Sequence, residues 1–319
     1  MAISRSEAAE LWRHPLVVLP GFMSDARIWE PQVRLLSRHL PVIVAPLRGA
    51  DRVEEVAADL LRSLPPRFTV FGADLGGSVA MAMLEQAPER IAGIGLIAAS
   101  PLPETPAQAV EREAWIVQAR AGRIRAAMQE ACPITALAPG SPRAEIMAAL
   151  ADMAEDLGPG LFVEQSRMMQ RRGDLQTVLR RAEQPALLVC GCHDTVVPLK
   201  RQLFTAELMR NAKIEMIEDA GHQPLLEQPE RVSAILYHWI MQGEVSRRDH
   251  QAAPQHRVHL SPQGAAKPVR RTFSRPMFQM VGEMRDEPTP YLLEQSPPVK
   301  FESIRRNKTG AGAGFRITG

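Results

Sequence analysis

One short turn combines an ionisable side chain with the residues that could expose it. An apolar run at 68–71 leads into Gly72-Ala73-Asp74-Leu75-Gly76-Gly77, and small residues with helical spacing follow at once. Glycines on both sides allow a sharp strand-to-helix turn, which lifts the central side chain above the edge of a sheet. The amide groups that begin the helix then face any negative charge that develops there. The side chain at the centre of this turn is Asp74.

Asp74 is suited to covalent catalysis. Aspartate has an ordinary pKa of about 3.9, so its carboxylate is ionised at pH 7 and needs no base to activate it. It can attack an sp³ carbon that carries a leaving group and form a covalent ester, which water then hydrolyses. Attack on the carbonyl of an ordinary ester would instead give a reactive mixed anhydride. The residue type therefore favours cleavage at an alkyl carbon.

The elements that must position this turn alternate along the chain. Short, continuous apolar runs, typical of strands covered on both faces, occur at residues 16–19, 42–45, 68–71, 94–98, 186–190 and 214–217. Helical spacing of apolar residues predicts helices at 53–64, 78–86 and 231–241. The alternation predicts an α/β fold with a doubly wound, mostly parallel sheet.

Residues 103–181 interrupt the alternation. They contain helical patterns at 107–121, 143–157 and 161–171 and no convincing strand. We expect a helical cap inserted into a core formed by residues 1–102 and 182–242. A cap in this place would lie over the carboxyl edge of the sheet, where ligands bind in open α/β folds.

Residues 243–319 differ in composition from the rest of the chain. They are rich in proline and glycine and carry a net charge of +6, whereas residues 1–242 carry −4. Such a segment cannot bury enough apolar surface to offset its conformational entropy, so a basic, disordered tail is predicted. Residues 276–284 form a short amphipathic stretch within it. The tail is a candidate contact for a protein partner, but acids and prolines interrupt its basic residues, so nucleic acid is not an expected partner.

Four segments of the chain resemble the α/β-hydrolase superfamily, together covering about residues 15–241. Residues 16–29 resemble its oxyanion strand and loop, 72–77 its nucleophile turn, 191–198 the strand end that carries its acidic residue, and 219–230 its histidine loop. The chain has the family's order of nucleophile, acid and histidine. The resemblance implies that Asp74 is the nucleophile, His222 the base and Asp194 its orienting partner. It also implies an oxyanion hole formed by the backbone N–H groups of Phe22 and Leu75.

Position 74 departs from the branch that the cap and the loop at 20–23 resemble most. That branch, the small bacterial esterases and lactonases, carries serine, whereas aspartate resembles the pattern of dehalogenases and epoxide hydrolases. Their groups for stabilising a leaving group are missing: residues 103–181 contain no tyrosine, and Leu75 stands where dehalogenases have tryptophan. Two interpretations stay open. The chain is either an Asp-dependent hydrolase for a small, mainly apolar substrate or a catalytically impaired member that serves as a binding or interaction scaffold.

The remaining expectations concern the substrate and the compartment. Trp115, Met168 and Met169 are expected to hold a small-molecule substrate under the cap. No metal or organic cofactor is expected, because two nearby cysteines without further ligands make a poor zinc site. An odd number of cysteines and the absence of a signal peptide or a long apolar run predict a cytoplasmic protein without membrane association.

Overall fold

A parallel sheet lies at the centre of the computed structural model, which describes residues 11 and 13–252 of the 319-residue chain. Its order is β2-β1-β3-β4-β5-β6, and each neighbouring pair is parallel. The strands are β1 (Leu16–Leu19), β2 (Val42–Val44), β3 (Phe68–Ala73), β4 (Ile91–Ile97), β5 (Ala186–Gly191) and β6 (Ala212–Ile217). Strands β1, β3, β4 and β5 are buried along their whole length, which explains their continuous apolar sequences. The predicted fold class is confirmed.

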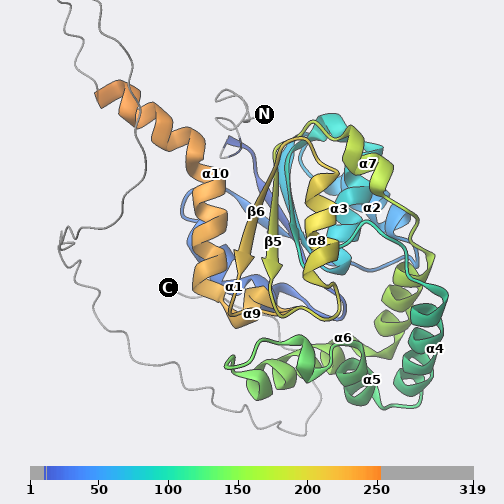
Figure 1. The fold of residues 1–319 in the computed structure, drawn as a ribbon. Coiled ribbons are helices and arrows are strands. Elements are labelled where there is room, and N and C mark those ends of the chain that lie inside the picture. The colour runs from blue at the N-terminus through green and yellow to red at the C-terminus, as the bar shows by residue number, and fades with distance from the viewer. Residues whose placement is uncertain (1–10, 12, 253–319) are drawn as a thin grey trace, which may run out of the picture. The chain divides into compact units, whose positions relative to one another are not determined.

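Helices cover both faces of the sheet (Figure 1). On one face, α1 (Glu30–Leu36) packs against α10 (Pro229–Ala252), and on the other α2 (Val53–Ser63) packs against α3 (Leu75–Gln86). Helix α8 (Leu199–Glu207) contacts β5 and β6. The short elements between them are η2 (Ala26–Trp29), η3 (Pro88–Arg90), η4 (Ile134–Ala136) and α9 (Pro224–Glu227).

Helix α10 corrects the predicted start of the tail. It continues to Ala252, so residues 243–252 are helical rather than irregular. A glycine inside a helix costs only about 1 kcal/mol, and Gly243 is therefore not enough to end a helix that is already packed against α1. The rest of the predicted tail, including residues 276–284, lies outside the described residues.

The helices between β4 and β5 include three that lie at the end of the sheet toward which the strand arrows point (Figure 1). These cap helices are α4 (Pro106–Arg120), α5 (Ile124–Ala131) and α6 (Arg143–Arg171), and each packs against the other two. Helix α6 is kinked where Gly158 has a φ of 83° and Pro159 follows, which is why the sequence predicts two helices there. The fourth helix, α7 (Gln176–Arg181), packs against α3.

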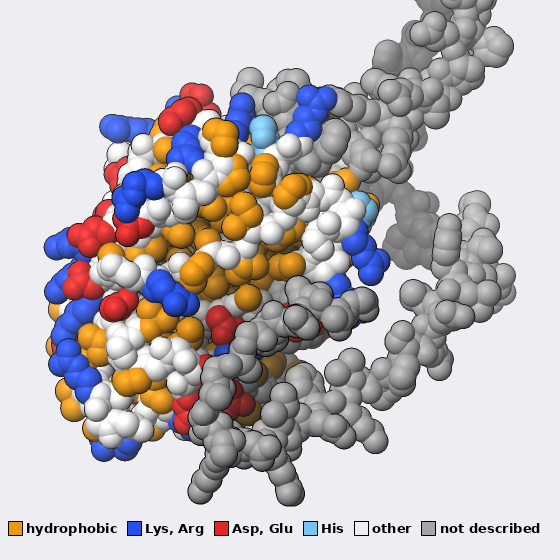
Figure 2. Space-filling view, turned by 180° about the vertical axis from the view of Figure 1, so that it is seen from behind, with side chains coloured by type: hydrophobic (Ala, Val, Ile, Leu, Met, Phe, Trp, Pro, Cys, Tyr) orange, Lys and Arg blue, Asp and Glu red, His pale blue; other side chains and the backbone are white. Residues whose placement is uncertain are grey.

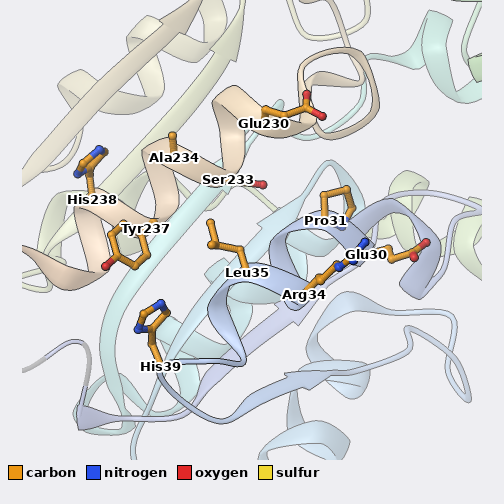
Figure 3. A pocket seen from close by; sticks show the side chains of 10 residues that line it. All are labelled: Glu30, Pro31, Arg34, Leu35, His39, Glu230, Ser233, Ala234, Tyr237 and His238. Atoms are coloured by element: carbon orange, nitrogen blue, oxygen red, sulfur yellow. The ribbon is translucent and has the colours of Figure 1, made fainter. Parts of the chain in front are cut away.

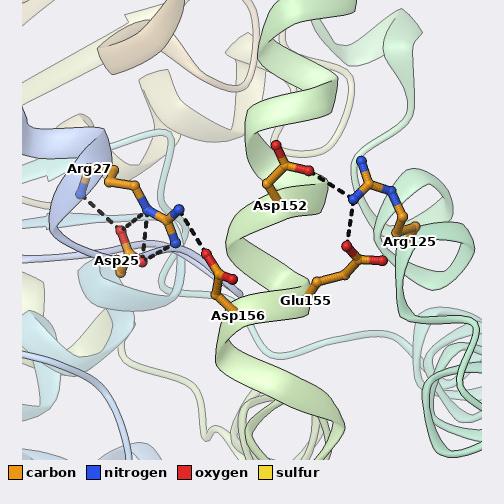
Figure 4. A network of polar contacts seen from close by, with 6 residues as sticks. All are labelled: Asp25, Arg27, Arg125, Asp152, Glu155 and Asp156. Atoms are coloured by element: carbon orange, nitrogen blue, oxygen red, sulfur yellow. Dashed lines mark hydrogen bonds and ion pairs between the residues drawn. The ribbon is translucent and has the colours of Figure 1, made fainter. Parts of the chain in front are cut away.

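Exposed ion pairs join the cap helices to each other and to the core (Figure 4). Arg125 of α5 lies 2.8 Å from Asp152 and 2.7 Å from Glu155, both on α6. Arg27 of η2 reaches Asp156 of α6 at 3.0 Å. Exposed pairs of this kind contribute at most about 1 kcal/mol each. The position of the cap therefore depends more on buried contacts, which are described with the site.

The surface behind the view of Figure 1 carries hydrophobic side chains across its middle and charged side chains along one rim (Figure 2). Apolar atoms make up more than half of the surface of ordinary folded proteins, so this alone identifies no function. None of the helices within the described ranges is both long enough and apolar enough to span a bilayer.

Candidate active site

Asp74 occupies the turn between β3 and α3 in a strained conformation, with φ 46° and ψ −111°. The flanking glycines are required by close backbone contacts. A Cβ on Gly72 would lie 2.2 Å from the carbonyl oxygen of Gly76, and one on Gly76 would lie 2.4 Å from that of Pro20. The N–H of Asp74 donates to the carbonyl of Ile97 at 2.9 Å. These contacts hold the half-buried carboxylate at the carboxyl end of the sheet.

One oxygen of the Asp74 carboxylate is fixed by the predicted oxyanion loop. The N–H of Phe22 donates to its Oδ2 at 3.1 Å. No hydrogen bond from the described residues reaches the other oxygen, Oδ1. Leu75, the second predicted donor, is the first residue of α3, where helix N–H groups have no partner within the helix. The loop therefore holds Oδ2, whereas Oδ1 accepts no hydrogen bond from the described residues.

Gln165 of cap helix α6 fixes the loop that carries Phe22. Its buried Oε1 accepts from the N–H of Met23 at 2.7 Å, and its Nε2 donates to the carbonyl of Leu47 at 2.9 Å. The ring of Phe22 also packs edge-on against Phe162 of the same helix, with centroids 5.1 Å apart. Nothing in the sequence pattern singles out Gln165, because its role arises only when α6 folds over the loop.

His222 and Asp194 meet as the resemblance implies. Nδ1 of His222 lies 3.0 Å from Oδ2 of Asp194, and both side chains are buried. Asp194 also accepts from the N–H groups of Val196 and Val197 at 2.9 and 2.8 Å and from Gln202 Nε2 at 3.1 Å. Because Asp194 occupies Nδ1, the other ring nitrogen of His222 is the one available for proton transfer.

The pKa of His222 is raised to about 9. Burial disfavours the charged ring, but the carboxylate of Asp194 outweighs burial through its charge and hydrogen bond, and Asp74 and Glu227 add to it. The ring is therefore charged at pH 7. Because folding raises this pKa, the contribution of His222 to stability is complete below its ordinary pKa of 6.5 and is lost as the pH rises through about 9.

Glu227 fastens the histidine loop to the segment that follows α5. Its Oε1 accepts from the N–H of Gly221 at 2.9 Å, and its Oε2 accepts from the N–H of Ala138 at 2.7 Å. The N–H of His222 itself donates to the carbonyl of Ala136 at 2.8 Å. The buried Glu227, like Gln165, is a positioning residue that acts between distant segments, so local sequence patterns do not reveal it.

A cavity of about 220 Å³ lies beside Asp74. Trp115 and Met169 line it, whereas Met168 is fully buried and is not among its lining residues. The cavity wall also contains charged side chains, which are Glu104, Glu111, Arg112, Glu130, Arg172 and Arg201. This wall does not fit the predicted, mainly apolar substrate, because charged residues of α4 and of the end of α6 face the cavity.

His222 and Asp194 are not among the residues that line this cavity. The charge of Asp74 nevertheless contributes to the raised pKa of His222, so the two side chains are close enough to interact. No hydrogen bond between them occurs within the described residues. An aspartate nucleophile has no proton to lose, so its attack does not require such a bond.

A larger groove, of about 730 Å³, lies between α1 and α10 (Figure 3). Arg34 and His39 line it from one side, and Tyr237 and His238 line it from the other. The rings of His39 and Tyr237 have centroids 5.1 Å apart. Asp74, Asp194 and His222 are all absent from its lining, so volume alone does not locate the chemistry.

Comparison with known proteins agrees with this fold. Residues 16–235 match the alpha/beta hydrolase family. The chain belongs to this family. It is 27% identical over 240 residues to the pimeloyl-[acyl-carrier protein] methyl ester esterase of Nitrosomonas europaea, a match that covers 68% of this chain and 91% of that protein. Family membership confirms the resemblance seen in the sequence and places the chain among the hydrolases.

Solved structures show the same fold. An esterase from Thermogutta terrifontis, solved with malate bound, aligns with a TM-score of 0.66 and 24% identity over 72% of this chain and 90% of that one. The enol-lactonase of Burkholderia xenovorans LB400 aligns with a TM-score of 0.63 and 19% identity over 72% and 92%. At these identities the likeness establishes the fold and does not identify the substrate.

Proposed function

We propose that this hydrolase uses Asp74 as a nucleophile on an sp³ carbon that carries a leaving group. The supporting observation is the placement of its carboxylate, with Oδ2 held by the N–H of Phe22 and the carboxylate at the wall of the cavity. In the first step, Oδ1 forms a bond to the carbon, and the leaving group departs with the electron pair of the broken bond. The product of this step is a covalent ester on Asp74.

Water completes the reaction in the second step. His222, oriented by Asp194, takes a proton from water, and the resulting hydroxide attacks the carbonyl carbon of the Asp74 ester. The negative charge that develops on Oδ2 faces the N–H of Phe22. When the intermediate collapses, the alcohol leaves with the proton held by His222, and Asp74 returns to a carboxylic acid that ionises.

The charges around His222 favour this order of steps. In the resting state Asp74 is one of the carboxylates that raise the pKa of His222 to about 9. Formation of the ester removes that negative charge, so the pKa of His222 falls and the ring releases its proton more readily. His222 therefore becomes a better base once the intermediate that needs hydrolysis has formed.

The same contact favours a second candidate. With the N–H of Phe22 already bonded to Asp74, an incoming ester carbonyl cannot use that donor. Asp74 would then have ended ester hydrolysis in a chain whose relative is named an esterase, leaving a binding scaffold. Both candidates imply a small-molecule ligand, because the cavity of about 220 Å³ admits little more. Location in the cytoplasm remains part of the proposal.

Trapping the covalent ester on Asp74 distinguishes the hydrolase from the binding scaffold. His222→Ala should still be alkylated but should not hydrolyse the ester, so incubation with short epoxides and haloalkanes should add one alkyl group to the intact mass. Peptide mapping should place the group on Asp74. The double variant Asp74→Asn/His222→Ala is the matched control and should stay unmodified. Absence of an adduct with both reagent classes, or an adduct that persists in the control, would contradict the Asp74 nucleophile.

A further inference from the structure

Arg172 is a buried cation beside the proposed nucleophile. It caps the C-terminal end of α6, its side chain lines the cavity, and the residue is only 9% exposed. Its Nη1 donates to the hydroxyl of Ser78 at 2.9 Å, while its Nε has no hydrogen-bond partner in the described part of the chain. Nor does any carboxylate there form an ion pair with it. A buried guanidinium without an ion pair is costly unless a ligand or another group compensates it.

A second buried arginine faces the same cavity. Arg112 of α4 is 7% exposed and binds Oε1 of Glu104 through Nε and Nη2. Its guanidinium lies over the rings of Phe22 and Trp115, 5.1 Å from each centroid, which fixes its plane. Its Nη1 is buried and has no partner within the described residues. The single bound glutamate therefore leaves part of this guanidinium unsatisfied.

The charges around Arg172 do not balance its burial. Burial lowers its pKa, the carboxylates of Asp74 and Glu104 act in the opposite direction, and Arg112 and Arg201 add to the lowering. Because the net effect is a lower pKa for Arg172, the nearby acids do not compensate for the removal of its guanidinium from water. The other acids of the cavity wall, Glu111 and Glu130, are exposed to solvent. An anion in the cavity would supply the missing compensation.

We propose that Arg172 and Arg112 form an anion subsite that binds a carboxylate beside Asp74. A planar guanidinium with free N–H groups matches the two oxygens of a carboxylate. The role of this subsite in catalysis rests on the proposed function, since the subsite would hold the carboxylate next to the carbon that Asp74 attacks. The carboxylate is then either a substituent that the substrate keeps or the anion that departs, and in both cases the arginines stabilise negative charge.

Equilibrium binding tests the subsite without requiring turnover. Succinate, uncharged succinamide and bromide are titrated into the intact chain and followed by calorimetry and by tryptophan fluorescence, to which Trp115 beside Arg112 should contribute. Succinate should bind, and Arg172→Gln should weaken it by at least about tenfold. Arg171→Gln is the matched control and should leave binding unchanged, because Arg171 is half-exposed and pairs with Asp51. Arg172→Lys keeps the charge and should weaken binding less than Arg172→Gln. The lysine variant therefore still tests the subsite if Arg172→Gln unfolds.

The outcomes distinguish a carboxylate that the substrate keeps from an anion that departs. They also distinguish failure of the anion subsite from failure of the Asp74 nucleophile. Tighter binding of succinate than of bromide supports a carboxylate kept by the substrate, and binding of both supports a subsite that also accepts a departing anion. Asp74→Asn should bind succinate more tightly than the parent, because it removes a nearby negative charge, and this holds even if no adduct ever forms on Asp74. Equal binding of succinamide, or equal weakening by Arg171→Gln, would overturn the anion subsite.

Discussion

Replacing Asp74 with serine should create hydrolysis of short nitrophenyl esters, at least about 100-fold above the parent protein. The variant removes the carboxylate that occupies the N–H of Phe22, so a substrate carbonyl can use that donor. It also removes one of the acids that raise the pKa of His222, which makes the ring a better base for the serine hydroxyl. Initial rates with nitrophenyl acetate and butanoate measure the gain.

The gain must depend on the rest of the triad. Asp74→Ser/His222→Ala should return to the rate of the parent, since His222 is the base that would take the proton of the serine hydroxyl. Asp74→Ala is a second control, because it also frees the N–H of Phe22 but supplies no hydroxyl. Ester hydrolysis that survives in Asp74→Ser/His222→Ala would show that the assembled triad is not responsible.

Asp74→Asn should abolish turnover of any compound that labels His222→Ala, by at least about 1000-fold. Asparagine has nearly the same shape, so the loss would come from the missing nucleophilic oxygen and not from a cavity. The variant also mimics the neutral ester intermediate, and the pKa of His222 should therefore move down from about 9. Nuclear magnetic resonance titration of the His222 ring measures that shift.

Asp25→Asn is the matched control for this variant. It removes a carboxylate from the loop after β1 that binds Arg27 and does not line the cavity. Turnover and the pKa of His222 should both stay at the parent values. If Asp74→Asn keeps the parent rate, Asp74 is not the nucleophile. If it lowers the pKa of His222 no more than Asp25→Asn does, Asp74 is not a neighbour of the base.

The sheet could be predicted because its signal is local. Strands β1, β3, β4 and β5 are buried on both faces, and each appears in the sequence as an apolar run. The turn at Asp74 could also be predicted, since the close contacts of Gly72 and Gly76 leave no space for a side chain. Asp194 and His222 required the family resemblance, because only their place in the chain order distinguishes them from loop residues.

The rest of the site depends on tertiary contacts that no local pattern encodes. Gln165 and Glu227 become positioning residues only when α6 and the segment after α5 fold against the loops of the core. Arg112 and Arg172 lie in helical sequence where a charge is normally solvated, and the arrangement of the cap buries both. The expectation of a mainly apolar substrate came from Trp115, Met168 and Met169 alone and did not include these charges.

The transfer of oxygen from Asp74 tests the central claim most directly. The wild-type protein, present in excess over a compound that alkylates it, is allowed one turnover in water enriched in oxygen-18. If Asp74 attacks carbon, the alcohol carries ordinary oxygen from the carboxylate, and the peptide that contains Asp74 gains one oxygen-18. If water attacks the substrate without a covalent intermediate, the alcohol carries oxygen-18 and the Asp74 peptide stays unlabelled, which would contradict the mechanism.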